Sequence, residues 1–292
     1  MASLKEVKSR ISSVVSTQQI TKAMKMVAAA KLRRSQDRII QMRPFAQRMK
    51  SILQNLSSAG DDGDAWYSKE RAVNKVLLVV ITSDRGLCGG FNSSVIKAAM
   101  QLTREKYSAQ MEKKNVTILP IGKKAFEFFG KRNFPMVSDY WNVFSALSFY
   151  RVSEAAQFMM DAFRKGEYDK IEVVYNQFKN VATQILVNEQ FLPVQPEAKG
   201  TKTQEIDYIY QPNQADILAA LIPKSLKVQL YKSVLDSNAS ENGARMTAMD
   251  KATENAGEML KELRLSYNRT RQAAITKEIL EIVGGAEALK AG

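Results

Sequence analysis

The sequence predicts an α/β protein in which long N- and C-terminal helices form an antiparallel coiled coil, with an α/β domain inserted between them. Apolar residues at helical spacing mark both ends of the chain, and strands alternate with helices in the middle. The predicted parts are a helix over 1–58, a globular α/β domain over 72–211 and a second helix over 214–292. With 292 residues, 45% hydrophobic and 25% charged, the composition is typical of a chain that buries a core.

The N-terminal helix is predicted by a stripe that begins Leu4, Val7, Ile11 and Val14, in steps of three and four. After a polar stretch the stripe takes the heptad spacing of a left-handed coiled coil. Its later members are Ile39, Met42, Ala46, Met49, Leu53 and Leu56. A cluster of helix breakers, SSAGDDGD at 57–64, is expected to end the helix and form a linker.

The middle of the chain changes to the period of strands. Runs of β-branched and apolar residues predict strands at 75–83, 115–122, 171–178 and 182–194. Helical patterns at 92–110 and 153–166 separate them. This alternation predicts a Rossmann-like domain with a mostly parallel sheet and a late antiparallel pair.

The C-terminal helix is predicted because Pro223 is the single proline after residue 214. Small or apolar residues again step by three and four at Met249, Ala252, Ala256, Met259 and Leu263. So long a pattern indicates a coiled coil, and the N-terminal helix is the natural partner.

Polar residues interrupt the expected seam of the two helices, at Gln18, Thr21, Asn242, Arg245 and Thr270. Buried polar groups cost stability, so they either fix the register or face a partner. The alternative is that the heptad assignment has slipped and these side chains are solvated.

The charge indicates an acidic partner. The chain carries a net charge of +13. Residues 1–58 hold twelve Lys/Arg against Glu6 and Asp37, a surplus of ten. A basic helix such as MKMVAAAKLRR at 24–34 also suits a nucleic-acid-binding coiled coil. Against that alternative, Phe45 is the single aromatic residue before position 59, so base stacking lacks a platform.

The composition also narrows the chemistry. The chain has no histidine and one cysteine, Cys88. These counts exclude an internal disulfide and a Cys/His zinc site, and they lower the expectation of catalysis. No signal peptide or membrane span is evident, which predicts a cytosolic chain or one on the cytosolic side of a membrane.

The stretch SDRGLCGGFN at 83–92 lies between a predicted strand and a predicted helix, where many proteins hold phosphate. It lacks the Lys and Ser/Thr of a GxxxxGK[ST] loop, and its GxxGG spacing differs from GxGxxG. What remains is a helix N-terminus preceded by Arg85, a weak anion site. The favoured interpretation is that its glycines allow a tight turn at positive φ.

Four stretches together resemble the gamma subunits of F-type ATP synthases. They are 4–38 (LKEVKSRISSVVSTQQITKAMKMVAAAKLRRSQDR), 82–92 (TSDRGLCGGFN), 240–260 (SENGARMTAMDKATENAGEML) and 275–289 (ITKEILEIVGGAEAL). The last fits the family signature at Ile275, Thr276, Glu278, Glu281, Gly285 and Ala286. The match covers both predicted helices and the start of the globular domain, in the family's order.

The resemblance implies a central rotary shaft of the bacterial type, without catalytic, cofactor or metal sites of its own. Its implied partners are the hexameric ring of alpha and beta subunits, the epsilon subunit and the membrane c-ring, and no nucleic acid. Its implied place is the cytoplasmic face of the inner membrane, reached through the complex. The implied contact residues are Met24, Lys25, Arg33, Arg34, Arg85, Cys88, Arg245, Gln272, Thr276 and Glu278.

Overall fold

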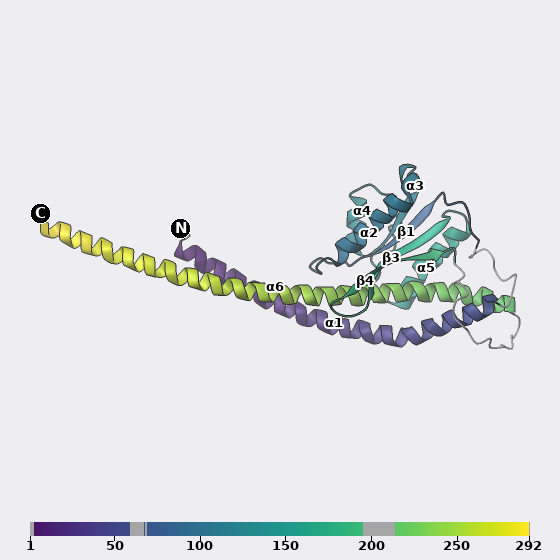
Figure 1. Cartoon of the computed structure of the whole chain (residues 1–292), viewed down its shortest axis with the longest axis horizontal. Coiled ribbons are helices and arrows are strands. Elements are labelled where there is room, and N and C mark those ends of the chain that lie inside the picture. The colour runs from purple at the N-terminus through teal and green to yellow at the C-terminus, as the bar shows by residue number, and fades with distance from the viewer. Residues whose placement is uncertain (1–2, 59–66, 68, 195–213, 292) are drawn as a thin grey trace. The chain divides into compact units, whose positions relative to one another are not determined.

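A computed structural model describes residues 3–58, 67, 69–194 and 214–291 (Figure 1). The chain divides into two compact units. The first unit, which we call the distal unit, comprises 1–27 and 246–292; the second, the proximal unit, comprises 28–245. Each unit is described by itself below.

The proximal unit is built on a four-stranded sheet whose order is β2-β1-β3-β4. Its strands are β1 (Val76–Ile81), β2 (Val116–Ile121), β3 (Lys170–Phe178) and β4 (Gln184–Leu192). β1 pairs in parallel with β2 and β3, whereas β3 and β4 are antiparallel. This is the mixed sheet that the sequence predicts.

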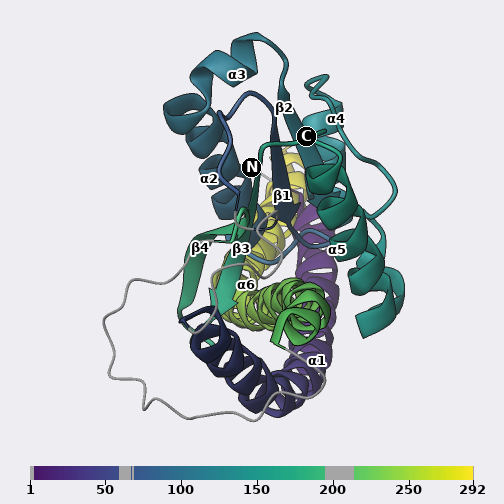
Figure 2. The ribbon, with the colours of Figure 1, turned by 90° about the vertical axis from the view of Figure 1, so that its right-hand side faces the viewer.

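Helices cover both faces of this sheet (Figure 2). On one face lie α2 (Phe91–Lys106) and α4 (Lys123–Gly130), whose apolar side chains pack with Val76, Leu78 and Val80 of β1. On the other face, α5 (Phe149–Arg164) and the proximal part of α6 (Gln214–Ala291) pack on the alternate residues of the same strands. Because side chains alternate along a strand, β1 contributes to two hydrophobic cores, one on each face of the sheet. The short elements are α3 (Ser108–Glu112) and the 3₁₀ helix η1 (Val143–Ala146).

The prediction of a single helix over 92–110 is wrong in one respect. The segment forms two helices, α2 and α3, that meet at Tyr107. The Tyr107 ring is buried in the core beneath α2, and its hydroxyl donates a hydrogen bond to the Glu172 carboxylate at 2.5 Å. Glu172 is a β3 residue with 1% of its surface exposed. A buried carboxylate needs donors, and drawing Tyr107 inward to supply one turns the chain out of the helix.

The helix α1 (Leu4–Ser58) and the helix α6 each continue through their proline, Pro44 and Pro223 respectively. In the proximal unit, the predicted positions Ile39 and Met49 are buried. The side chains of Leu53 and Leu56 lie outside the described residues, as does the predicted linker from residue 59 to 64. Between the two helices, Ser35 Oγ donates to Asn238 Oδ1 at 2.7 Å.

In the distal unit, α1 and α6 run antiparallel along a partly polar seam. Thr253 Oγ1 donates to Thr21 Oγ1 at 2.8 Å, and one turn along α1, Lys25 Nζ meets Asp250 Oδ1 at 2.5 Å. Gln18 Nε2 lies 3.5 Å from the Thr253 carbonyl oxygen. Polar groups that pair across a seam favour one register over its neighbours.

The predicted stripe of α6 is only partly right. Met249 and Ala256 are buried as expected, but Met259 is 52% exposed and its neighbour Leu260 is buried instead. An α-helix has 3.6 residues per turn, so a stripe read as steps of three and four drifts by one position along its length. Of the other polar seam positions, Asn242 is buried, and Thr270 Oγ1 bonds the Ser266 carbonyl of its own helix.

Candidate functional site

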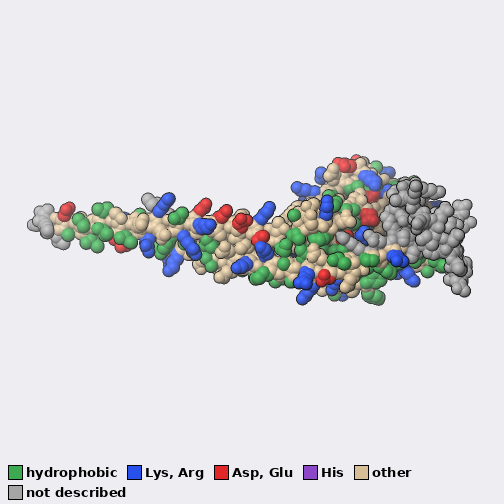
Figure 3. Space-filling model, turned by 60° about the horizontal axis from the view of Figure 1, so that its bottom comes forward, with side chains coloured by type: hydrophobic (Ala, Val, Ile, Leu, Met, Phe, Trp, Pro, Cys, Tyr) green, Lys and Arg blue, Asp and Glu red, His purple; other side chains and the backbone are tan. Residues whose placement is uncertain are grey.

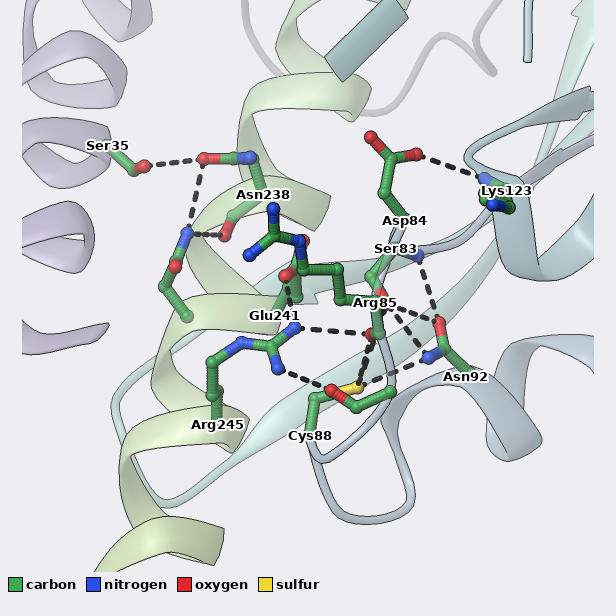
Figure 4. Close-up of polar contacts among 12 residues, drawn as sticks. Ser35, Ser83, Asp84, Arg85, Cys88, Asn92, Lys123, Asn238, Glu241 and Arg245 are labelled. Atoms are coloured by element: carbon green, nitrogen blue, oxygen red, sulfur yellow. Dashed lines mark hydrogen bonds and ion pairs between the residues drawn. The ribbon is translucent and has the colours of Figure 1, made fainter. Parts of the chain in front are cut away.

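The loop that joins β1 to α2 is held together by its own side chains. Ser83 N–H donates to Asn92 Oδ1 at 2.9 Å, and Ser83 Oγ donates to the Arg85 carbonyl at 2.6 Å. Asn92 Nδ2 also lies 3.2 Å from Cys88 Sγ. Polar side chains at both ends of the loop thus close it into a compact turn (Figure 4).

The glycines explain this turn only in part. Gly89 has a φ of 58°, as the sequence predicts, whereas the other left-handed residue is Leu87 with a φ of 62°. A leucine in that region is strained, since its Cβ crowds the backbone. The Leu87 side chain is also 67% exposed, so the residue with the strained backbone carries an apolar side chain that faces solvent.

The C-terminal helix holds this loop from outside through what we call the clasp, formed by Arg245 and Glu241 of α6 with Arg85 and Gly86 of the loop. The Arg245 guanidinium donates to the Gly86 carbonyl and, at 3.2 Å, to the Arg85 carbonyl. It also pairs with the Glu241 carboxylate at 2.7 Å, one turn back on α6 (Figure 4). Several donors of one guanidinium are therefore used at once, a role for which a lysine is a poor substitute.

The clasp suits a cation and disfavours a phosphate at this place. The Arg85 and Gly86 carbonyl oxygens point toward α6, whereas a phosphate loop directs backbone N–H groups at its ligand. Burial raises the pKa of Glu241, and the charge of Arg245 opposes that rise. The Arg245 guanidinium therefore links the loop that follows β1 to α6.

Cys88 does not lie where the sequence predicts it. It is 1% exposed, which contradicts its expected place on a contact surface. Burial raises the pKa of its thiol, although the Ser83 hydrogen bond and the Arg245 charge act in the opposite direction. Leu87 and Arg85 are the exposed side chains of this loop instead.

Arg245→Ala is expected to raise the rate at which N-ethylmaleimide labels Cys88 in the full chain by about tenfold. Loss of charge-assisted hydrogen bonds worth about 1.5–3 kcal/mol lets the loop open more often. Removing the Arg245 charge also raises the thiol pKa, and the pH profile separates the two effects. Greater exposure raises the rate at high pH, whereas the lost charge moves the midpoint upward.

Arg85→Ala is the matched control, because Arg85 contributes its carbonyl to the clasp and its side chain is exposed. We expect this variant to label at the rate of the unmodified chain. Equal rates in the Arg245→Ala variant and the unmodified chain would show that the clasp does not protect the thiol.

The remaining predicted residues of α1 lie on two units. In the distal unit, Met24 is half-buried and Lys25 pairs with Asp250, with 40% of the lysine side chain exposed. In the proximal unit, Arg33 and Arg34 are both exposed. A half-exposed pair such as Lys25–Asp250 is worth about 0–1 kcal/mol, so a partner carboxylate can compete for the lysine.

The predicted residues of α6 near its end, Gln272, Thr276 and Glu278, are all exposed. Thr276 Oγ1 donates to the Gln272 carbonyl of the same helix at 2.9 Å. Every side chain from 275 to 287 is exposed. The apolar ones among them are Ile275, Ile279, Leu280, Ile282 and Val283.

Sequence reasoning missed Glu241, Asn92 and Leu87. Glu241 lies four residues before Arg245, the spacing of an ion pair on one helix face, and this signal was available. Asn92 follows the glycines at the start of a predicted helix, a common place for a capping side chain. Leu87 carries no pattern that marks it.

Within the described parts of the chain, no group of three or more His, Cys, Asp or Glu residues is placed to hold a metal ion. Among the helices over the same residues, none has a segment of the length and hydropathy needed to cross a membrane.

Comparison with known proteins gives one consistent result. A family model described as ATP synthase matches residues 3–289. An ATP synthase gamma chain from Cytophaga hutchinsonii is 57% identical over 99% of this chain and 99% of its own. The gamma chain from Flavobacterium psychrophilum is 54% identical over 99% of this chain and 100% of its own.

Solved structures agree on the fold. A chain of the Euglena gracilis mitochondrial ATP synthase, described as OSCP/F1/c-ring in rotational state 3, gives a TM-score of 0.65 at 21% identity. The alignment covers 99% of this chain and 95% of that one. Together with the identity to the bacterial relatives over nearly the whole sequence, these matches mean that the chain belongs to the ATP synthase gamma chain family.

Proposed function

We propose that this chain is the central rotary shaft of an F-type ATP synthase, which couples ion flow through the membrane c-ring to ATP synthesis and hydrolysis by the alpha and beta subunits. One observation carries the proposal. The C-terminal end of α6, from Ile275 to Val283, presents large apolar side chains to solvent, as Figure 3 shows. The chain itself has no active site in this proposal.

The apolar end of α6 calls for a partner that covers its apolar side. Ile282 is 71% exposed, and Ile279 and Leu280 are more than half exposed. Contiguous exposed apolar side chains mark interaction sites. At 3.6 residues per turn, the exposed apolar residues lie on one side of the helix, and they are Ile275, Ile279, Leu280, Ile282 and Val283. The apolar wall of a partner such as the alpha–beta ring fits this side.

Charge supports a second set of contacts along α1. Arg33 and Arg34 are exposed, and the helix that carries them has a surplus of basic residues. Acidic segments of the beta subunits are the proposed partners. Exposed ion pairs are worth about 0–1 kcal/mol each, so they can break and re-form as a shaft turns.

The proposed contact residues follow from these two surfaces and from the loop. They are Met24, Lys25, Arg33, Arg34, Arg85, Gln272, Thr276 and Glu278, with Leu87 and the apolar residues Ile275, Ile279, Leu280, Ile282 and Val283 added on their exposure. Arg245 acts through the clasp, by fixing the loop that carries Arg85. Cys88 is left out as a contact because it is buried.

The remaining partners are proposed from the family. The epsilon subunit and the c-ring would bind the α/β domain, and the chain would lie at the cytoplasmic face of the bacterial inner membrane through the complex. The description of the Euglena assembly names F1 and a c-ring, which supports the c-ring as a partner.

Reconstitution tests the proposal. Added to purified alpha and beta subunits and the membrane sector, the chain is expected to restore ion-coupled ATP synthesis, while alone it hydrolyses no ATP. Ile279→Asp with Leu280→Asp is expected to lower coupled synthesis by about tenfold or more, since burying unpaired carboxylates is costly. Asn255→Asp with Asn268→Asp, also exposed on α6, is the matched control and is expected to keep coupling.

Coupled synthesis that proceeds equally well without the chain would overturn the proposal. A nucleic-acid-binding role would appear in a different experiment. Filter binding that persists at physiological salt, with a sequence preference, would favour that alternative.

A further inference from the structure

The α2–α4 face of the sheet carries a groove that none of the proposed contact residues lines. It has a volume of about 920 Å³ and runs along α2 from Asn92 to Glu105, against α4 and the residues that follow it. The groove lies on the opposite face of the sheet from the α5 and α6 packing. The proposed function places partners on the α/β domain but assigns none of the residues that line this groove, so an inference about the groove goes beyond it.

The floor of the groove is apolar. Ile96 is buried, and Met100 and Phe128 are half-buried at its base. The Arg132 guanidinium lies 3.7 Å from the centroid of the Phe128 ring and covers one end. Two neighbouring helices with an apolar trough between them offer the surface into which the ridge of a third helix packs.

The rim of the groove is basic. Five lining residues are cationic, namely Lys97, Arg104, Lys124, Lys131 and Arg132, against the two acidic residues Glu105 and Glu127. Both acids are engaged: Glu105 accepts from Gln101 Nε2 at 2.8 Å, and Glu127 pairs with Lys124 at 2.7 Å. Among the described residues, Lys97 and Arg104 have no hydrogen bond or ion pair through their side chains.

We propose that this groove binds an amphipathic helix of a partner protein whose apolar face meets Ile96, Met100 and Phe128 and whose flanks carry Asp and Glu toward Lys97 and Arg104. The lining residues of α2 span about 20 Å at ~1.5 Å per residue, which matches a partner helix of roughly four turns. Charge complementarity selects the acidic flanks, because a neutral or basic helix would leave the two unpaired cations facing like or absent charge.

The first test uses a synthetic acidic amphipathic helix of about four turns, with leucines on one face and glutamates on the other, and the full chain. Binding is followed by fluorescence anisotropy. Lys97→Glu with Arg104→Glu is expected to weaken binding by about tenfold, because each exchange turns an attraction into a repulsion. Lys69→Glu with Lys179→Glu makes the same charge change at exposed positions outside the groove and is expected to alter the affinity by less than about twofold.

Equal weakening in the two double variants would show that the peptide responds to net charge alone, which overturns the groove as the site. Equally tight binding of a peptide with lysines in place of the glutamates would overturn the acidic preference.

The second test uses the assembled complex. A photoreactive p-benzoylphenylalanine at Met100 is expected to crosslink, on illumination, to an acidic helical segment that mass spectrometry then identifies. A crosslink to lipid, to a second copy of this chain or to a basic segment contradicts the proposal, as does the absence of any crosslink. These outcomes leave the reconstitution experiment unaffected, so the groove and the rotary function can fail separately.

Discussion

Gly122→Ala is expected to destabilise the proximal unit by about 2–6 kcal/mol. Gly122 lies between β2 and α4 with a φ of 104°, where an L side chain is strained. A Cβ built there would lie 2.1 Å from the Thr82 carbonyl oxygen and 2.7 Å from its carbonyl carbon. Backbone strain of about 1–3 kcal/mol and overpacking of about 1–3 kcal/mol add in the same direction.

The measurement is urea unfolding of the full chain, followed by circular dichroism. Gly130→Ala is the matched control at the end of α4, where the added Cβ would lie 3.3 Å from the flexible Cε of Met136. Alanine is the better helix former by about 0.8–1.0 kcal/mol. This gain offsets the cost of the small shift that the Met136 side chain must make, so the control is expected to unfold near the midpoint of the unmodified chain. The same midpoint for Gly122→Ala would contradict the strain argument.

Glu172→Gln is expected to cost about 2–4 kcal/mol. The Glu172 carboxylate accepts hydrogen bonds from Lys106 Nζ at 2.5 Å, Tyr107 Oη at 2.5 Å and Asn188 Nδ2 at 3.1 Å. A glutamine keeps one acceptor oxygen for Lys106 and Tyr107, but it removes the charge that pairs with Lys106 and sets an amide donor against Asn188 Nδ2. Glu112→Gln on α3, which is exposed, is the control and is expected to change stability by less than about 0.5 kcal/mol.

The same carboxylate gives stability a dependence on pH. Burial alone would raise the pKa of Glu172, but the hydrogen bonds from Lys106, Tyr107 and Asn188 hold it below its ordinary value. A lowered folded-state pKa means that the contribution of Glu172 is complete above the unfolded-state value near 4.3, and is lost as the pH falls through the folded-state value. The free energy of unfolding of Glu172→Gln should therefore fall less steeply on acidification below about pH 5 than that of the unmodified chain. Parallel pH profiles would contradict this assignment.

Periodicity predicted the elements of this chain well, because burial on one or two faces sets the spacing of apolar residues. The strand predicted at 75–83 is continuous in apolar residues from 76 to 81, and β1 is buried on both faces. The same logic failed at Tyr107, where the helix ends because a carboxylate 65 residues away needs a donor. No local pattern holds that information.

The site was predicted in part for a similar reason. Exposure of Arg33, Arg34, Gln272 and Glu278 follows from polarity on helices, so these residues lie where a partner can reach them. The burial of Cys88 and the contacts of Arg245 depend on how the loop folds against α6. Arg245 and Gly86, which are in contact, are 159 residues apart in the sequence. Spacing along the chain cannot show such a contact, so the clasp became visible only in three dimensions.

The polar seam of the distal unit has a mechanical consequence. Sliding α1 along α6 by one residue, about 1.5 Å, would part the Thr21 and Thr253 hydroxyls and stretch the Lys25–Asp250 pair at the same time. Leucine packing alone tolerates such slippage far better, since apolar contacts are not directional. The polar contacts of the seam thus resist sliding of α1 along α6. A twist applied to one helix is therefore transmitted to the other while the two helices keep their register.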